Sequence, residues 1–439
     1  MVKRLFFDDE TFIENINDEE SIVISPKNGK LFKTSKNFGK FIGKLIDNDG
    51  FLTKDLLVRA ETNNDIINSL LETKVFFDDK KKLIDDIYMF KKKYQSLMTN
   101  QTPKVAYLHL THACNFNCWY CYNANIDKNR NDELSASEWI DIFHKLKEIG
   151  VKKFVITGGE PLLRNDLYDI LYKAKKEDIN IELLTNGSLF DKFDILKLSD
   201  VVDKIVISLD SMEKSVFSKS REATFFDKIQ TFIDILSVHA HDKLYIRSVI
   251  TKDNISSIKE TKEILKNRYG IKNYITSIFL PNSLEEVKLM PNIDKIIELE
   301  KTLNSEFGRN INYDLSYNLK CGASNLIIAI DKKGDMYPCQ NFIGIDRFKM
   351  TNILNKNWWN EYDTSYIRNI FAGLSVDGKK KCKNCSYRYL CGGGCPAISW
   401  RVYGNLNSYL PFLCKYLKFY AKERVINASY KEVNIINEK

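Results

Sequence analysis

The sequence predicts an α/β protein built around a partial (β/α)6 TIM barrel, with a smaller α+β unit before it and a cysteine-rich region after it. Two observations predict this organisation. Between residues 104 and about 280, short apolar stretches alternate with helical patterns, which is typical of parallel βα units. Beyond about residue 310 the alternation stops, and seven of the ten cysteines follow. A chain of 439 residues has room for about three domains.

Composition and charge exclude several classes of protein. Hydrophobic residues make up 44% and charged residues 28% of the chain, which favours folded cores over disorder. The net charge of +8 is spread along the chain, and no basic stripe interleaved with aromatic residues occurs, so we expect no nucleic-acid partner. The N-terminus lacks a long apolar signal, and no apolar stretch approaches the ~20 residues of a membrane helix. We therefore expect a cytoplasmic protein without a membrane partner, in which clustered cysteines serve metal binding or catalysis.

Residues 1–95 are predicted to form the α+β unit. The segments SIVIS (21–25) and KLFK (30–33) flank Asn28–Gly29, which is typical of a β-hairpin. A helix with one apolar face follows and ends near Gly50. Further helices are expected at 62–73 and 80–98, and the linker NQTP (100–103) leads into the barrel.

The barrel is assigned to residues 104–310. A capping box, SASE (135–138), predicts the start of its first helix. Six strands are too few to close an eight-stranded barrel, and parallel βα units place their active site at the carboxyl ends of the strands. The six candidates are LHL (108–110), KFVIT (153–157), IELLTNG (181–187), KIVISLD (204–210), YIRSVI (245–250) and YITSIF (274–279).

Three cysteines follow the first strand directly, in CNFNCWYC (114–121). Three thiolates from one loop, Cys114, Cys118 and Cys121, can ligate three irons of a [4Fe–4S] cluster and leave the fourth iron open. Zinc with His112 as fourth ligand, or buried free cysteines, are the alternatives. The position at the mouth of a βα barrel favours the cluster.

The barrel segment resembles the radical S-adenosylmethionine enzymes over about residues 104–300. After the cysteine motif, TGGEPLL (157–163), LLTNG (183–187) and ISLDS (207–211) match the further motifs of that family in order. The resemblance implies that S-adenosylmethionine binds the open iron. It implies cofactor-binding roles for Tyr120 against the adenine, for Gly158, Gly159 and Glu160 at the methionine amino group, and for Asn186, Ser208 and Asp210.

Two arginines are candidates for the methionine carboxylate. A guanidinium binds a carboxylate through two parallel hydrogen bonds. Arg221 follows the ISLDS motif, and Arg247 lies in the strand candidate YIRSVI (245–250). The alternative for each is a surface ion pair.

The C-terminal cysteines, in residues 311–439, resemble a SPASM domain, the extension of radical enzymes that modify peptides and proteins. Their C-x2-C spacing also occurs in zinc ribbons, the alternative interpretation. The resemblance implies two auxiliary [4Fe–4S] clusters, and hence three clusters in all. One would be held by Cys382, Cys385, Cys391 and Cys414, and the other by Cys321, Cys339 and Cys395.

The ligand count leaves one iron without a cysteine. Three cubanes require more ligands than the ten cysteines supply. With the methionine group of the cofactor on one iron, the vacant position falls on the cluster of Cys321, Cys339 and Cys395. We hypothesise that this iron binds a substrate thiolate, a soft ligand suited to iron. Water or a side chain other than cysteine is the alternative ligand.

The N-terminal pattern resembles the winged-helix-like PqqD-like recognition element of ribosomally synthesised peptides (RiPPs). Such a module would bind the leader of a precursor peptide by strand addition; a capping domain is the alternative. The resemblances together imply a maturase that forms cysteine thioethers through a 5′-deoxyadenosyl radical, as in sactipeptides and ranthipeptides, with flavodoxin or ferredoxin as electron donor.

Three other functions remain open. A maturase forming carbon–carbon or carbon–oxygen crosslinks has the same architecture. An anaerobic sulfatase-maturing enzyme also has a SPASM domain, usually with one more cysteine and without the N-terminal unit. A non-catalytic iron–sulfur electron carrier is the third, although a carrier has no need of the cofactor-binding segments GGEP and SLDS.

Overall fold

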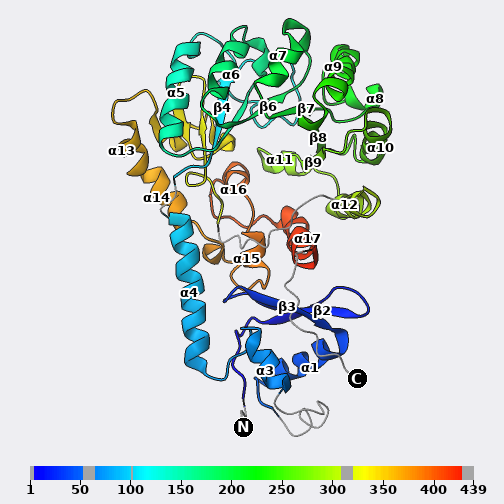
Figure 1. Ribbon diagram of the computed structural model, residues 1–439, viewed down its shortest axis with the longest axis vertical. Helices are drawn as coiled ribbons and strands as arrows, with labels where there is room; N and C mark the ends of the chain where they lie inside the picture. Colours follow the sequence, from blue (N-terminus) through cyan, green and yellow to red (C-terminus); the bar gives the residue numbers. More distant parts are fainter. Residues whose placement is uncertain (1–3, 53–64, 100–101, 308–319, 428–439) are drawn as a thin grey trace.

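The computed structural model describes residues 4–52, 65–99, 102–307 and 320–427, and Figure 1 shows their arrangement. The N-terminal unit and the βα barrel lie at opposite ends of the molecule. The C-terminal helices α15 (Arg388–Cys391), α16 (Pro396–Tyr403) and α17 (Pro411–Asn427) lie between them. The long helix α4 (Lys80–Thr99) runs from the N-terminal unit toward the barrel.

The N-terminal unit contains a three-stranded antiparallel sheet in the order β1 (Phe12–Asn15), β2 (Glu20–Ser25), β3 (Lys30–Ser35). The predicted hairpin is confirmed, because Ser25 pairs with Lys30 across the Asn28–Gly29 turn. Strand β1 was not predicted. Its sequence, FIEN, has a single apolar pair between charged or polar neighbours.

Helices cover this sheet. The side chain of Ser35 caps α1 (Lys36–Asp47), and Gly50 follows with φ +80°, so the predicted first helix is confirmed. Helix α3 (Asp65–Glu72) corresponds to the predicted second helix, of which residues 62–64 lie outside the described residues, as do residues 100–101 of the predicted linker. The core of the unit comprises Leu5, Val23, Phe32, Ile42, Leu45, Ile67, Leu70, Val75 and Phe76.

Six parallel strands form the barrel segment, as predicted. They are hydrogen-bonded in chain order: β4 (Val105–Thr111), β5 (Lys153–Gly158), β6 (Asn180–Thr185), β7 (Lys204–Ser208), β8 (Leu244–Ile250) and β9 (Tyr274–Ile278). The intervening helices include α5 (Ala136–Glu148), α6 (Leu167–Lys175), α7 (Ile195–Asp200), α8 (Lys214–Phe217), α9 (Phe226–His239) and α10 (Ile258–Tyr269).

Apolar side chains on the outer face of this sheet pack under the helices. Leu108, Ile156, Leu183 and Ile205 are fully or almost fully buried in one cluster with residues of the helices, such as Trp139. The capping box at Ser135 is present, because Ser135 and Glu138 each accept from the other's backbone N–H. Strong burial of the outer face fixes the pairing register of the strands. The opposite face of the sheet and the carboxyl ends of the strands therefore form the inner wall of the barrel.

Three C-terminal strands extend the barrel sheet on its other edge. Strand β10 (Ile327–Ile330) is parallel to β4, and β11 (Asp335–Tyr337) and β12 (Thr351–Asn352) continue antiparallel from it. These strands were not predicted, because the sequence pattern beyond about residue 310 indicated only that the βα alternation stops. These strands have four residues or fewer, too short for a sequence period. The domain boundary predicted at residues 310–311 lies outside the described residues.

The C-terminal helices contact both neighbours. Ile22 and Ile24 of β2 share a buried cluster with Val376, Tyr389, Leu390, Ala421 and Val425. On the opposite side, Ile398, Val402 and Leu413 pack with Tyr120 and Phe279 of the barrel. The remaining helices are α11 (Leu284–Val287), α12 (Ile293–Phe307), α13 (Trp358–Asp363) and α14 (Tyr366–Gly373). No helix in the described ranges has the length and apolar character to cross a membrane.

Candidate active site

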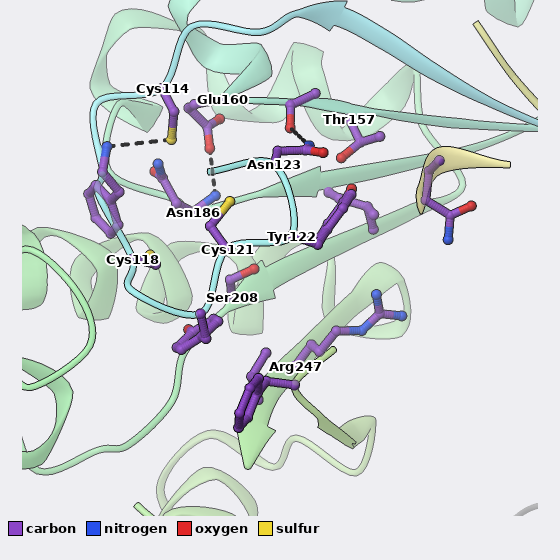
Figure 2. A pocket seen from close by; sticks show the side chains of 18 of the residues that line it. Cys114, Cys118, Cys121, Tyr122, Asn123, Thr157, Glu160, Asn186, Ser208 and Arg247 are labelled. Carbon is purple, nitrogen blue, oxygen red and sulfur yellow. Dashed lines mark hydrogen bonds between the residues drawn. The ribbon is translucent and has the colours of Figure 1, made fainter. Parts of the chain in front are cut away.

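A cavity of about 370 Å³ opens at the carboxyl ends of the barrel strands. Its wall includes the three cysteines of the loop after β4, the ends of β5 to β9, and two residues from the loop after β11. Figure 2 shows Cys121, Glu160, Asn186, Ser208 and Arg247 around this space. The parallel topology explains the convergence, because all strand ends meet at one edge of the sheet.

The cysteine loop is held in a partly buried conformation. The sulfur of Cys114 accepts a hydrogen bond from the Phe116 N–H at 3.4 Å. Burial raises the pKa of the Cys114 thiol to about 11, and burial also raises the pKa of Cys118. Burial favours the neutral form of these thiols. Binding of a metal cation would stabilise the thiolate form instead. The three sulfur donors suit soft metal ions such as the irons of a cluster.

Gly158 and Gly159 allow strand β5 to approach this loop closely. A Cβ on Gly158, which has φ +137°, would lie 2.1 Å from the Thr111 carbonyl oxygen, and one on Gly159 would lie 2.0 Å from that of Ala113. The N–H groups of Gly159 and Glu160 donate to these two carbonyls, both at 2.8 Å. Side chains at either glycine would push the strand end away from the cysteine loop.

Glu160 is a buried carboxylate that joins the segment after β5 to the end of β6. It accepts hydrogen bonds from the Asn186 N–H at 2.6 Å, the Thr185 hydroxyl at 2.7 Å and the Leu162 N–H at 3.0 Å. Burial raises its pKa to about 7, although these donors oppose the rise. A cation in the cavity would stabilise the ionised form.

The two candidate arginines occupy different environments. Arg247, on β8, lines the cavity, and its buried Nε has no hydrogen-bond partner among the residues that the structure describes. Arg221 also lines the cavity, but its Nε donates to the carboxylate of the buried Asp210 at 2.8 Å. Arg247 therefore has hydrogen-bonding capacity available for an anion, whereas Arg221 already has a counterion.

Asp210 lies behind the cavity wall, unlike the other candidate cofactor residues. It is fully buried and accepts hydrogen bonds from Tyr120, Ser220 and Arg221 and from the Val249 N–H. The cavity is lined by the remaining candidates: Cys114, Cys118, Cys121, Tyr120, Gly158, Gly159, Glu160, Asn186, Ser208, Arg221 and Arg247.

Several lining residues were not predicted. Ser277 to Leu280 lie at the carboxyl end of β9. The expectation that the active site lies at the carboxyl ends of the parallel strands could have identified them. Tyr122 and Asn123 follow the last cysteine of the loop, and Asn123 donates to the Gly158 carbonyl at 3.3 Å. Gln340 and Asn341 come from the C-terminal region, and no local pattern indicates their place in this wall.

The charge effects among the C-terminal cysteines fall within two groups, Cys321, Cys339 and Cys395 in one and Cys382, Cys385, Cys391 and Cys414 in the other. The charges of Cys321 and Cys395 raise the pKa of Cys339, after the larger effect of burial. The charges of Cys385 and Cys414 likewise raise the pKa of Cys382, after the larger effect of burial. Gln340 and Asn341, which line the cavity, follow Cys339 directly.

The arrangement of His112 and the cysteines bears on the zinc alternative. Among the described residues, no three His, Cys, Asp or Glu side chains are grouped as ligands of a single metal ion. Burial lowers the pKa of His112 to about 4, and its Nε2 has no partner. A cubane differs from a single ion in that its ligands bind separate iron atoms.

Comparison with known proteins agrees with the fold and the cavity. Residues 108–281 match the family model described as Radical SAM superfamily. This segment is thus a radical SAM domain, and together with the maturase relatives it shows that the protein is an enzyme.

Relatives extend the comparison beyond this domain. The chain is 28% identical over 312 residues to the mycofactocin maturase MftC of Mycobacterium tuberculosis, covering 66% of this chain and 78% of the relative. In structure, it is similar to Streptococcus suis SuiB bound to the precursor peptide SuiA, with a TM-score of 0.60, 16% identity, and coverage of 94% of this chain and 100% of SuiB. It is also similar to anSMEcpe with bound AdoMet and Cp18Cys peptide, with a TM-score of 0.59, 20% identity, and coverage of 74% and 99%.

Proposed function

We propose that this enzyme crosslinks a ribosomally made precursor peptide by forming thioether bonds between cysteine sulfur and carbon. One observation carries the proposal. A single cavity is bounded by the Cys114–Cys121 loop on one side and by Gln340 and Asn341, next to Cys339, on the other. A peptide in this cavity would lie between the radical-generating site and an auxiliary site. The peptide-modifying relatives MftC and SuiB support the substrate class.

The residues of the cavity fit S-adenosylmethionine and a [4Fe–4S] cluster. Cys114, Cys118 and Cys121 would hold the cluster, and the buried carboxylate of Glu160 suits the methionine ammonium. The unpartnered Nε of Arg247 suits the methionine carboxylate. The buried ring of Tyr120, fixed by its hydrogen bond to Asp210, offers an apolar surface for the adenine.

Thioether formation is a two-electron oxidation of the peptide. A C–H bond and an S–H bond are lost, and a C–S bond forms. When bound, S-adenosylmethionine and its cluster supply the 5′-deoxyadenosyl radical that takes the hydrogen atom, and the auxiliary clusters supply acceptors for the second electron. The chain orients the peptide and excludes water, and its own thiols hold the clusters.

Arg401 connects the walls between which the peptide would lie. Its Nη1 donates to the Tyr122 carbonyl at 2.9 Å, and its Nη2 donates to the Asn341 carbonyl at 2.6 Å. A third hydrogen bond joins it to Asn282, beyond β9. One side chain thus fixes the cysteine loop relative to the segment after Cys339, which keeps the distance between the two sites constant.

The N-terminal unit is proposed to bind the leader of the precursor as a PqqD-like element. Strand β3 pairs only with β2 among the described residues, so its other edge has unpaired backbone groups for an added strand. Capture of the leader there would raise the effective concentration of the core peptide at the cavity. Flavodoxin or ferredoxin remains the proposed electron donor.

Mass spectrometry of the product tests the proposal. A cysteine-containing peptide encoded beside the gene is incubated anaerobically with reduced enzyme and S-adenosylmethionine, and then treated with a thiol-alkylating reagent. Loss of two hydrogens per event, with cysteines that no longer alkylate, would establish the thioether. The same mass loss with all cysteines still alkylating would instead indicate a carbon–carbon or carbon–oxygen crosslink.

A further inference from the structure

Lys379 is a buried lysine that lies between the two sets of C-terminal cysteines. Only 4% of its surface is exposed. Its Nζ donates hydrogen bonds to the carbonyl oxygens of Gly393 at 2.8 Å and Ser408 at 3.2 Å. Gly393 lies between Cys391, a member of one set, and Cys395, a member of the other. The ammonium is therefore held against the short loop that joins the sets.

Two further contacts place Lys379 next to both sets. Its carbonyl accepts a hydrogen bond from the Cys382 N–H at 2.8 Å. A small cavity is lined by Lys379, Cys321, Gly392 and Gly394. Lys379 thus adjoins one set through its main chain and shares a cavity with a member of the other.

The charge of Lys379 has no carboxylate partner within the described ranges of the chain; its ammonium is bound by backbone carbonyls. Burial lowers its pKa, and the groups that oppose this effect are four cysteines, two from each set: Cys382, Cys395, Cys391 and Cys321. A buried cation is unfavourable without a countercharge. Thiolate-ligated clusters on both sides would provide one.

We propose that Lys379 is a positioning residue whose ammonium is the shared countercharge of both auxiliary clusters and raises the reduction potential of each. This inference rests on the proposed assignment of the two cysteine sets to clusters. An added electron makes a cluster more negative, and a fixed positive charge nearby stabilises that reduced form. One ammonium between the clusters acts on both, so each becomes a better acceptor for the electron released from the peptide.

An anaerobic redox titration of the reconstituted full-length enzyme, followed by EPR, tests this role. The samples are wild type, Lys379→Gln and Lys379→Arg, with iron per chain measured for each. Glutamine keeps an N–H donor without the charge, whereas arginine keeps the charge. We expect Lys379→Gln to lower the midpoint potentials of both auxiliary clusters and Lys379→Arg to retain them. The potential of the cluster at Cys114, Cys118 and Cys121 should be unchanged.

Lys320→Gln is the matched control. Lys320 is 7% exposed, precedes Cys321 and donates to the Ala372 carbonyl at 3.0 Å, and burial alone lowers its pKa. This variant should not change the potential of the cluster at Cys382.

The outcomes separate the charge of Lys379 from its shape. Unchanged auxiliary potentials in Lys379→Gln, or equal shifts of both clusters in Lys320→Gln, would overturn the proposal. Loss of auxiliary iron from Lys379→Gln but not from Lys379→Arg would support it, and loss from both would refute it. Iron for only one cluster in the wild type would contradict the assignment of the cysteine sets instead.

Discussion

At the scale of single residues, Asp210 organises one wall of the cavity from behind. Tyr120, Ser220 and Arg221 all donate to its carboxylate, and two of them line the cavity. The charge of Asp210 keeps the Arg221 guanidinium stable in a largely buried position. The sequence motif ISLDS indicated Asp210 as a cofactor residue, whereas the structure shows contacts with other side chains of the wall.

Asp210→Asn should strongly destabilise the protein, because it leaves the buried guanidinium of Arg221 without a counterion. We expect the free energy of unfolding to fall by roughly 3–5 kcal/mol. Denaturant unfolding of the wild type and the variant measures the change. The control is Asp242→Asn, since the Asp242 side chain is fully exposed; a loss at Asp210 no larger than at Asp242 would contradict the role.

Arg247→Met should weaken the binding of S-adenosylmethionine. A hydrogen bond to a charged group contributes about 1.5–3 kcal/mol, so we expect affinity to fall by roughly 10- to 100-fold. Anaerobic equilibrium binding to the cluster-loaded enzyme measures this change. Arg268→Met is the control, because the Arg268 side chain is 58% exposed and pairs with Asp234. Equal affinities of wild type and Arg247→Met would exclude Arg247 from the cofactor site.

His109 should make the protein less stable in acid. It is fully buried on β4 with neither ring nitrogen hydrogen-bonded, and burial lowers its pKa well below 6.5. The unfolded chain then binds a proton that the folded chain does not, so stability decreases as pH falls below about 6.5. Between pH 7.5 and pH 5.5 this effect amounts to about 1.4 kcal/mol.

Unfolding of wild type and His109→Phe at both pH values checks this prediction. The variant should lose about 1.4 kcal/mol less than the wild type on acidification. The comparison between the two proteins cancels any loss of cluster at low pH that they share. An identical pH dependence would mean that His109 binds protons equally in the folded and unfolded chain.

At the scale of elements, the sequence predicted those strands whose apolar residues form a run of several positions between helical segments. The six barrel strands have five to seven residues each, and all were found. Strands β10 to β12 were missed because their pairing depends on β4, far away in the sequence. The same reason applies to Gln340 and Asn341, whose place in the cavity follows from that pairing and not from local sequence.

Loss of cysteines from different elements should separate two activities. Cys118→Ala removes a ligand from the loop after β4 and should abolish cleavage of S-adenosylmethionine. The Cys382→Ala substitution lies in the C-terminal cysteine-rich region. This variant should retain part of the cleavage activity but form no crosslink, because the acceptor for the second electron is lost. Chromatography of 5′-deoxyadenosine and mass spectrometry of the peptide measure the two activities.

Either of two results would contradict these assignments. Full crosslinking by Cys382→Ala would exclude the auxiliary role of that set. Absence of cofactor cleavage in the wild-type enzyme after reduction would instead indicate an electron carrier.

At the scale of the whole molecule, the N-terminal unit contacts the segment between Cys385 and Cys391 directly. Tyr387 and Arg388 lie between Cys385 and Cys391, and they bind Glu14 and Glu10 of the N-terminal unit. Arg388 is only 4% exposed and also pairs with Asp377 at 3.0 Å. The module proposed to bind the leader and the proposed auxiliary cluster thus share an interface.

The double variant Glu10→Gln/Glu14→Gln should loosen this loop. Two charge-assisted hydrogen-bonding groups are lost at a largely buried interface, so we expect amide hydrogen exchange in residues 385–391 to accelerate about tenfold or more. Mass spectrometry of exchanged peptides measures the rate. Glu285→Gln, in an exposed pair with Lys288, is the control. Unchanged exchange in the double variant would show that apolar packing alone fixes the loop.

The insertion of β10 beside β4 has a consequence for biosynthesis. Val105 of β4 pairs with Ile327, so the first barrel strand keeps an unpaired edge until the C-terminal region has left the ribosome. The barrel cannot complete its sheet during synthesis of its own six strands. A nascent chain stopped before β10 would expose a β-strand edge beside the cysteine loop, so the barrel sheet is expected to become complete only after Ile327–Ile330 has been translated.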